Sequence, residues 1–227
     1  VSVQALTGGG RRPKPGEISL ATGGILFLDE LPEFSRAALE TLRQPLEDRE
    51  VTVSRVEATV TYPANFQLVA AMNPCPCGHF PDLARCRCTE GQITRYLQKI
   101  SGPLLDRIDL CVEASPVTYG DIRGGGENEA SGAIRARVEQ AREIQKERFM
   151  EENIRCNGEM AGRHIRKYCV LGKEEETFME EIFEKLALSA RMHDRILKVA
   201  RTTADLAGAS EIRLSDLCEA VSYVKSR

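Results

Sequence analysis

Two adjacent carboxylates, Asp29 and Glu30, are the side chains most able to do chemistry, and they directly follow a short apolar run at 25–28. Four consecutive apolar residues fit a strand buried on both faces of a parallel sheet. Open α/β sheets bind ligands at the carboxyl ends of such strands. In nucleotide hydrolases an acid placed there holds Mg²⁺, and a second one polarises the attacking water. Taken alone, the pattern favours the plainer interpretation of a strand that stops at a solvated acidic turn.

Four cysteines are the second set of residues that could do chemistry. Cys75 and Cys77 are separated by eight residues from Cys86 and Cys88. Four thiolates satisfy tetrahedral Zn²⁺, and a metal would order a loop that has little core of its own. Sulfur would fill every ligand position, so we expect a structural site with no place for a catalytic water. The C-x-C arms are shorter than the usual C-x₂₋₄-C arms, and His79 lies nearby. The alternatives are reduced thiols or a disulfide formed during handling.

The composition of the 227 residues is that of an ordinary globular protein, with 42% apolar and 29% charged residues. A net charge of −3 gives no bulk argument for nucleic-acid binding, so any such site has to be a local patch. No apolar stretch approaches the roughly 18–20 residues of a membrane span. Eight cysteines and the lack of an apolar signal region favour the reducing cytoplasm. The missing initial Met suggests a piece of a longer protein.

The elements that must position these residues are strands in the first half of the chain. Apolar runs at 25–28, 66–71 and 108–112 predict three buried strands. Two β-rich pieces between 50 and 62, separated by a polar tip, predict a hairpin. The strand at 66–71 ends at Asn73, which places a second polar side chain at a strand exit.

Helical patterns dominate the rest of the chain. Ser35 fits the N-cap of a helix closed by Pro45, and a further helix is expected at 89–100. The Gly-rich stretch 116–131 reads as a linker. Beyond it the spacing of apolar residues predicts only helices, the last of them capped by Ser215. The fold class is therefore α/β, followed by an all-helical region.

Short motifs in a fixed order around the two acids resemble the magnesium-chelatase-like AAA+ ATPases, most closely their ComM-like branch. The resemblance covers essentially the whole chain and is carried by GEISLA at 16–21, LPEF at 31–34, RQPLE at 43–47, MNP at 72–74 and GPLLDRID at 102–109. It implies a partial AAA+ core of the phosphate-loop type at 1–115, a linker at 116–131 and a helical lid at 132–227.

The resemblance also implies roles for individual residues. Asp29 corresponds to the Walker B magnesium ligand, Glu30 to the catalytic base, Asn73 to sensor 1, Arg107 to an arginine finger that acts on a neighbouring subunit, and Arg191 to sensor 2. Arg195, one turn later, is the rival for sensor 2. A guanidinium suits developing phosphate charge because its planar fork offers several donors. The alternative for each arginine is an ion pair with a nearby aspartate.

Family members are linked to competence and DNA branch migration, which implies DNA as a partner. The hairpin at 50–62 matches the pre-sensor-1 hairpin that related helicases project into a central channel, and Arg55 lies near its tip. Arg11, Arg12 and Lys14 lie where the family's helix-2 insertion ends. Basic residues on such loops contact phosphate without reading sequence. The alternative is solvated charge on turns.

The departure from the family is the absence of any Gly-x-x-x-x-Gly-Lys-Ser/Thr motif. We therefore expect the chain alone neither to bind ATP tightly nor to hydrolyse it. The phosphate-loop strand would lie between those at 66–71 and 108–112, so its slot in the sheet is open. An exposed edge invites pairing, which makes strand exchange around 108–112 a hypothesis.

The parent protein is accordingly expected to bind ATP and Mg²⁺ between subunits of a homo-oligomeric ring, a hexamer, and to drive translocation on single-stranded or branched DNA. No membrane partner is expected. Two other functions remain open: an ATPase chaperone of the metal-chelatase type, and a zinc-stabilised interaction module without enzymatic activity.

Overall fold

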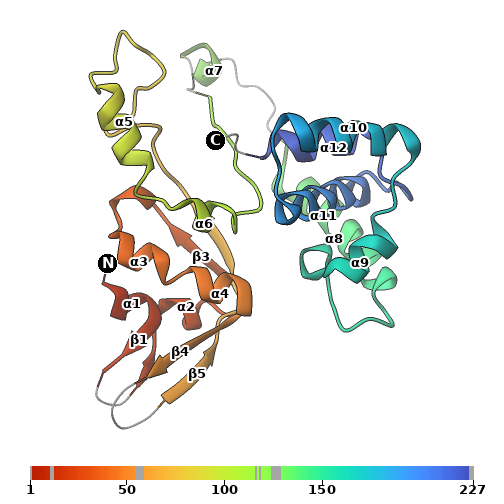
Figure 1. The fold of residues 1–227 in the computed structure, drawn as a ribbon, viewed down its shortest axis with the longest axis horizontal. Helices are drawn as coiled ribbons and strands as arrows, with labels where there is room; N and C mark the ends of the chain where they lie inside the picture. The colour runs from red at the N-terminus through yellow and green to blue at the C-terminus, as the bar shows by residue number, and fades with distance from the viewer. Residues whose placement is uncertain are drawn as a thin grey trace. The chain divides into compact units, whose positions relative to one another are not determined.

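The computed structural model describes residues 2–10, 13–54, 59–115, 117, 119–123 and 129–224. The chain divides into two compact units, residues 1–108 and 109–227 (Figure 1). Unit 1 combines short strands with short helices around a small parallel sheet, and unit 2 is helical in its described residues. The predicted α/β class with a helical C-terminal region is confirmed at this level.

The parallel sheet of unit 1 pairs β3 (Ile25–Leu28) with β6 (Gln67–Ala70) in register from Ile25↔Gln67 to Leu28↔Ala70. The pairing continues past both strands, because the Ala71 N–H donates to the Leu28 carbonyl and the Leu31 N–H to the Ala71 carbonyl, each at 3.0 Å. The carboxyl ends of β3 and β6 therefore lie side by side.

Only one face of this sheet is covered. Leu26 and Leu28 are buried, whereas Ile25 is 62% and Phe27 58% exposed. Val69 on β6 is also exposed, at 37%. The predicted burial on both faces is therefore wrong for both strands. The apolar run fits a doubly covered strand, but the described residues supply layers on one side only.

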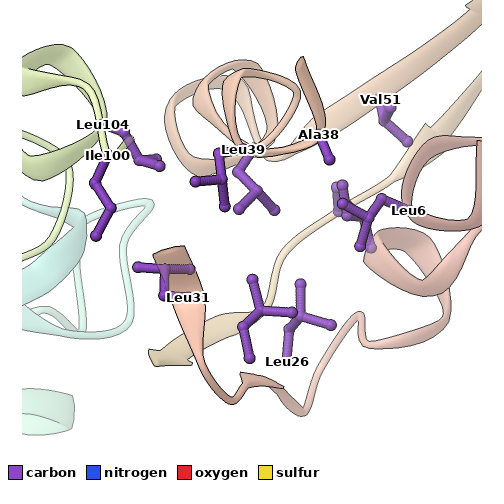
Figure 2. Close-up of a cluster of buried hydrophobic side chains, with 12 residues drawn as sticks. Leu6, Leu26, Leu31, Ala38, Leu39, Val51, Ile100 and Leu104 are labelled. Atoms are coloured by element: carbon purple, nitrogen blue, oxygen red, sulfur yellow. The ribbon is translucent and has the colours of Figure 1, made fainter. Parts of the chain in front are cut away.

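The covered face of the sheet packs on a single apolar core. In Figure 2, Leu6, Leu26, Leu31, Leu39 and Leu104 converge on this interior. The core is completed by short helices: α1 (Val3–Thr7), α2 (Glu17–Leu20), η1 (Leu31–Glu33), α3 (Arg36–Glu40) and α4 (Arg43–Asp48).

The helix predicted after Ser35 is confirmed at its start and divided in its middle. The Ser35 hydroxyl accepts a hydrogen bond from the Ala38 N–H at 3.2 Å, as an N-cap does. Leu42 separates α3 from α4, so that Pro45 falls in the first turn of α4, where its missing N–H costs little. Pro45 is thus tolerated inside the second helix and does not end the first.

Unit 1 also contains two antiparallel hairpins. β4 (Glu50–Ser54) pairs antiparallel with β5 (Thr59–Pro63), which confirms the predicted hairpin, and β1 (Gly8–Gly9) pairs with β2 (Lys14–Pro15). The Tyr62 hydroxyl donates to the Pro13 carbonyl at 2.8 Å and so joins the two hairpins. β4 and β5 lie at the opposite end of unit 1 from α5 (Glu90–Leu97) (Figure 1).

The third predicted strand, at 108–112, does not form. The residues there adopt no regular structure, and Leu110 and Val112 are 50% and 75% exposed. The Cys111 N–H donates instead to the Tyr223 carbonyl at 3.1 Å. Among the described residues this segment pairs with no strand, and an unpaired strand would leave its backbone groups without partners. α6 (Gly102–Leu105) precedes this segment.

Unit 2 consists of helices packed around their own core. They are α7 (Tyr119–Arg123), α8 (Ser131–Arg148), η2 (Asn157–Glu159), α9 (Gly162–Tyr168), α10 (Lys173–Lys185), α11 (Ala190–Leu206) and α12 (Leu214–Ser222). α7 falls inside the stretch predicted as a linker. Gly208, with φ +66°, follows α11 in the left-handed conformation that ends many helices.

The last helix begins differently from the prediction. Arg213, not Ser215, is the N-cap of α12, and the buried Asp216 carboxylate accepts the Arg213 backbone N–H at 2.9 Å. Asp216 therefore takes the capping role that Ser215 was expected to play. None of the helices in the described residues combines the length and apolar character that a membrane crossing requires.

Candidate active site

Asp29 and Glu30 emerge where β3 ends, at the surface of unit 1. The Asp29 Oδ1 accepts a hydrogen bond from the Glu30 N–H at 2.8 Å, and both residues are exposed. Glu30 has φ 51° and ψ 48°, a left-handed conformation that is uncommon outside glycine. Such backbone outliers cluster at functional sites because the surrounding structure has to enforce them. Carboxylate oxygens are also the ligands that Mg²⁺ prefers, so this donor set fits the predicted ion.

Asn73 follows β6, the neighbour of β3, so the pairing of the two strands brings it to the same edge as the two acids. Its backbone N–H lies near the hydroxyl oxygen of Tyr96 on α5 and acts to lower the pKa of that hydroxyl. Tyr96 is 6% exposed, and its pKa is raised, first by burial and then by the carboxylates of Glu33 and Glu30. Tyr96 therefore lies close both to Asn73 and to the acidic end of β3 at Glu30.

Tyr96 was not among the predicted site residues. Lys99, two residues after the end of α5, pairs with Glu33 at 3.5 Å and lies 5.6 Å from the Tyr96 ring centre. The only sequence signal for Tyr96 was its apolar spacing within a predicted helix, which indicates burial and no particular contact.

The four cysteines meet, as predicted, in the loop between β6 and α5. Their sulfur atoms all lie within 4.8 Å of one another. The sulfur–sulfur distances are 3.4 Å for Cys75–Cys77, 3.8 Å for Cys75–Cys86 and 3.6 Å for Cys77–Cys86. Sulfurs about 2.3 Å from a tetrahedral zinc are roughly 3.8 Å apart, whereas a disulfide bond is about 2.05 Å long. All four thiols are free, and the cluster has the dimensions of a metal site.

Hydrogen bonds prepare one of these sulfurs to carry charge. Backbone N–H groups of His79 and Arg87 donate to the Cys77 sulfur and lower its pKa to about 6. Burial and the neighbouring Cys77 sulfur raise the pKa of Cys88 to about 12. Cys77 therefore forms a thiolate more readily than Cys88, and a bound cation would offset the charge of further thiolates.

The other four cysteines behave differently from the cluster. Only Cys169 among them is buried, and burial raises its pKa to about 11. Cys218 is exposed, and Cys111 and Cys156 are half-buried.

Arg107, the predicted arginine finger, is held inside unit 1. Its guanidinium forms an ion pair with Glu47 and donates to the Pro103 carbonyl at 2.7 Å. Its side chain is 13% exposed and that of Glu47 46%. The predicted alternative, an ion pair, is therefore present, although its partner is Glu47 and not a neighbouring aspartate.

The two candidates for sensor 2 differ in accessibility. Arg191, in the first turn of α11, is exposed, whereas Arg195 is only 9% exposed within unit 2. Between the two, Arg191 is the better placed to contact a ligand outside unit 2.

Of the predicted DNA contacts, Arg11, Arg12 and Arg55 lie outside the described residues. Lys14 is described and exposed on β2. The bond from Tyr62 to Pro13 sets the hairpin that carries Lys14 against the β4–β5 hairpin. Both hairpins predicted to meet DNA therefore belong to one surface region of unit 1.

Sequence comparison identifies the class of protein that carries this site. Residues 1–122 match the family described as magnesium chelatase, subunit ChlI, and residues 128–224 match the ChlI C-terminal family. The chain belongs to the magnesium chelatase ChlI family, which confirms the resemblance carried by its motifs.

Particular relatives sharpen this assignment. The chain is 48% identical to Competence protein ComM of Haemophilus influenzae over 223 residues, which cover 98% of this chain and 43% of that protein. It is 47% identical to the uncharacterized protein YifB of Salmonella typhimurium and 40% identical to Rv2897c of Mycobacterium tuberculosis, again over 98% of the chain. The chain spans 43% to 44% of the length of these relatives.

Proposed function

We propose that the chain supplies the water-activating and phosphate-sensing half of an AAA+ ATPase site. The observation that carries this proposal is the meeting of Asp29 and Glu30 with Asn73 at the carboxyl ends of two paired parallel strands. Magnesium, when bound, would neutralise phosphate charge. Asp29 would hold it, Glu30 would accept a proton from the attacking water, and the Asn73 carboxamide would orient that water.

ATP turnover is proposed for a longer polypeptide and not for this chain alone. The 227 residues contain no phosphate-binding motif with the required lysine and hydroxyl, and the relatives are more than twice as long as the matched region. Residues 1–115 would act as the partial AAA+ core and 132–227 as the lid, joined by 116–131.

A chimera tests this assignment directly. The 223 matching residues of the Haemophilus ComM protein are replaced by those of this chain, and ATP hydrolysis is measured. Asp29→Asn and Glu30→Gln are each expected to lower turnover by about 10²–10³-fold, because each removes a charge that acts on the reacting groups. Asp48→Asn, a substitution of an exposed aspartate at the end of α4, is the matched control and should leave turnover unchanged. Full turnover by Glu30→Gln would contradict the proposal.

Arg107 is proposed to act on the site of a neighbouring subunit in a homo-oligomeric ring. Arg191 is proposed to act from the lid. An arginine finger contributes roughly 10³–10⁵ in rate, so Arg107→Ala should inactivate a uniform ring. Mixing chimeras that carry Arg107→Ala with chimeras that carry Glu30→Gln should restore part of the activity, because some interfaces then combine two intact halves. No recovery in mixed rings, verified by co-purification of two tags, would place Arg107 within its own subunit's site.

DNA is the proposed target of the motor, as the competence name of one relative suggests. The joined hairpins support the proposal, because they place Lys14 beside the hairpin that ends near Arg55. Binding of single-stranded DNA should weaken as salt rises, and Lys14→Ala should reduce the salt slope by about 1. Salt-independent ATPase activity without DNA stimulation would favour the chaperone function of the metal-chelatase type.

The cysteine cluster is proposed to hold structural zinc. The sulfur separations carry this second proposal, since three of them match the edges of a zinc–thiolate tetrahedron. Chain purified under reducing conditions should contain about one zinc per molecule by elemental analysis. Stable metal-free chain with the loop fully ordered would indicate reduced thiols instead.

A further inference from the structure

The loop that carries the four cysteines has almost no apolar core. Of residues 71–88, all of which the structure describes, Cys75 alone is buried. Met72, at the start of the segment, packs against the core of unit 1, but Phe80 and Leu83 are 40% and 82% exposed. Hydrophobic burial therefore cannot fix the path of this segment, and the meeting of the four sulfurs is its main internal constraint.

At Gly78 the loop faces the side chain of Asn73. Gly78 follows Cys77 with φ +80°, and a Cβ built on it would lie 3.8 Å from both Cγ and Oδ1 of Asn73. The backbone of the loop thus faces the Asn73 carboxamide. The positive φ explains why glycine occupies this position, since a side chain would strain the turn.

The far end of the loop reaches Asn73 by a second route. Cys88 is followed by Thr89, whose hydroxyl accepts the Gln92 N–H at 3.3 Å and caps α5. α5 carries Tyr96, whose buried hydroxyl lies near the Asn73 backbone N–H. When the four sulfurs are held together, they therefore fix the loop from Cys75 onward and also the start of α5, the helix that carries Tyr96.

We infer that metal bound by the four cysteines positions Asn73, through the Gly78 backbone and through Tyr96, and thereby controls the proposed phosphate-sensing site. Tyr96 and Gly78 are positioning residues, because they act through Asn73. This inference rests on the proposed zinc site and on the proposed role of Asn73. Loss of metal would release the loop and leave Asn73 without a fixed orientation, which makes the ATPase site sensitive to metal and to thiol oxidation.

Amide hydrogen exchange of the whole chain tests the inference without any ATP turnover. Chain stripped of metal under reducing conditions is compared with chain loaded with one equivalent of Zn²⁺, and exchange is followed at single residues by NMR. Zinc should slow exchange of the Asn73 amide roughly tenfold, the effect of securing one hydrogen bond when the loop is ordered. Amides of α11 should change less than about twofold, because α11 belongs to the other compact unit.

Variants separate the metal site from its coupling to Asn73. Cys86→Ser should abolish zinc binding and leave Asn73 in fast exchange, while Cys218→Ser, at an exposed cysteine, should match the unmodified chain. Tyr96→Phe should still bind one zinc yet lose most of the zinc-dependent protection at Asn73. Tyr62→Phe, which removes a hydroxyl bonded to Pro13 instead, should retain that protection.

Each contrary result is distinct. If zinc binds stoichiometrically and the Asn73 exchange rate does not change, the coupling is wrong and the zinc site stands. If Tyr96→Phe keeps the full protection, Tyr96 is not the link and the inference in this form is overturned. If no metal is retained, both the zinc proposal and the coupling fail, whereas the ATPase proposal remains to be judged by the Asp29 and Glu30 variants.

Discussion

The two units of this chain stabilise themselves in opposite ways. Unit 2 buries charged side chains and satisfies them internally: Asp205 is fully buried and accepts hydrogen bonds from Arg148 at 2.7 Å and Asn157 at 2.8 Å. Unit 1 keeps its carboxylates exposed at a strand exit and leaves one face of its sheet uncovered, with Phe27 58% exposed. The helical unit is closed on itself, whereas the unit that carries the candidate site is open where ligands and further layers would bind.

The largest expected effect would break the self-contained network of unit 2. Asp205→Ala removes the acceptor shared by Arg148 and Arg201 and leaves their charges buried without compensation. Such a loss costs about 3–5 kcal/mol of the free energy of unfolding. Urea unfolding followed by region-resolved hydrogen exchange should show that unit 2 alone is destabilised. Glu181→Ala, at an exposed pair with Lys185, is the control and should cost less than about 0.5 kcal/mol.

A pair of neighbouring positions tests whether the sheet of unit 1 is covered on one face only. Leu28→Ala should cost about 2–5 kcal/mol, because Leu28 is 5% exposed and packs in the core. Phe27→Ala should cost less than about 1 kcal/mol, since its side chain already faces solvent. Chemical denaturation monitored by circular dichroism measures both. Equal losses would mean that the outer face is covered in solution, for example by a second copy of the chain.

The sequence predicted those parts of unit 1 that depend on local pattern. The apolar run at 25–28, the cap at Ser35 and the hairpin at 50–62 are set by side-chain period and turn chemistry, and the structure contains them. The strand expected at 108–112 failed because strand formation requires a partner edge, which is a property of the assembled sheet. An apolar run indicates that burial is possible, and the layers available decide whether it occurs.

The residues of the candidate site also divide into those that the sequence could predict and those that it could not. Asp29, Glu30, Asn73 and the four cysteines were recognisable because their residue types and spacing are themselves the chemistry. Tyr96 and Glu47 were missed, because each acts only through a contact made in three dimensions. A tyrosine on an amphipathic helix and a glutamate near a helix end carry no local sign of the partner they meet.

A smaller effect concerns the cap of α12 in unit 2. Burial would raise the pKa of Asp216, but hydrogen bonds from the Arg213 guanidinium and backbone N–H, together with the guanidinium charge, lower it below the ordinary 3.8. A lowered folded-state pKa means that the stabilisation is complete above the unfolded value and is lost as pH falls through the folded one. Asp216→Asn should lose about 1 kcal/mol at neutral pH and show a weaker acid dependence below pH ~4. An unchanged acid limb in the pH profile would contradict this role.

The smallest expected effect concerns how firmly Arg107 of unit 1 is held, compared with the arginines bound to Asp205 in unit 2. Glu47→Gln removes the charged partner of Arg107, whose ion pair is partly solvated because Glu47 is 46% exposed. The free energy of unfolding should fall by less than about 1 kcal/mol, as at other partly exposed pairs. Thermal unfolding measures the change, with Glu181→Gln as a matched loss of one carboxylate in unit 2. A loss above about 3 kcal/mol would mean that Arg107 is held as firmly as the arginines that bind Asp205. An arginine finger has to leave Glu47 to reach a neighbouring subunit, so this result would contradict that proposed role. A small loss instead leaves Arg107 able to exchange Glu47 for the proposed contact with a neighbouring subunit, in contrast to the arginines held by the buried Asp205.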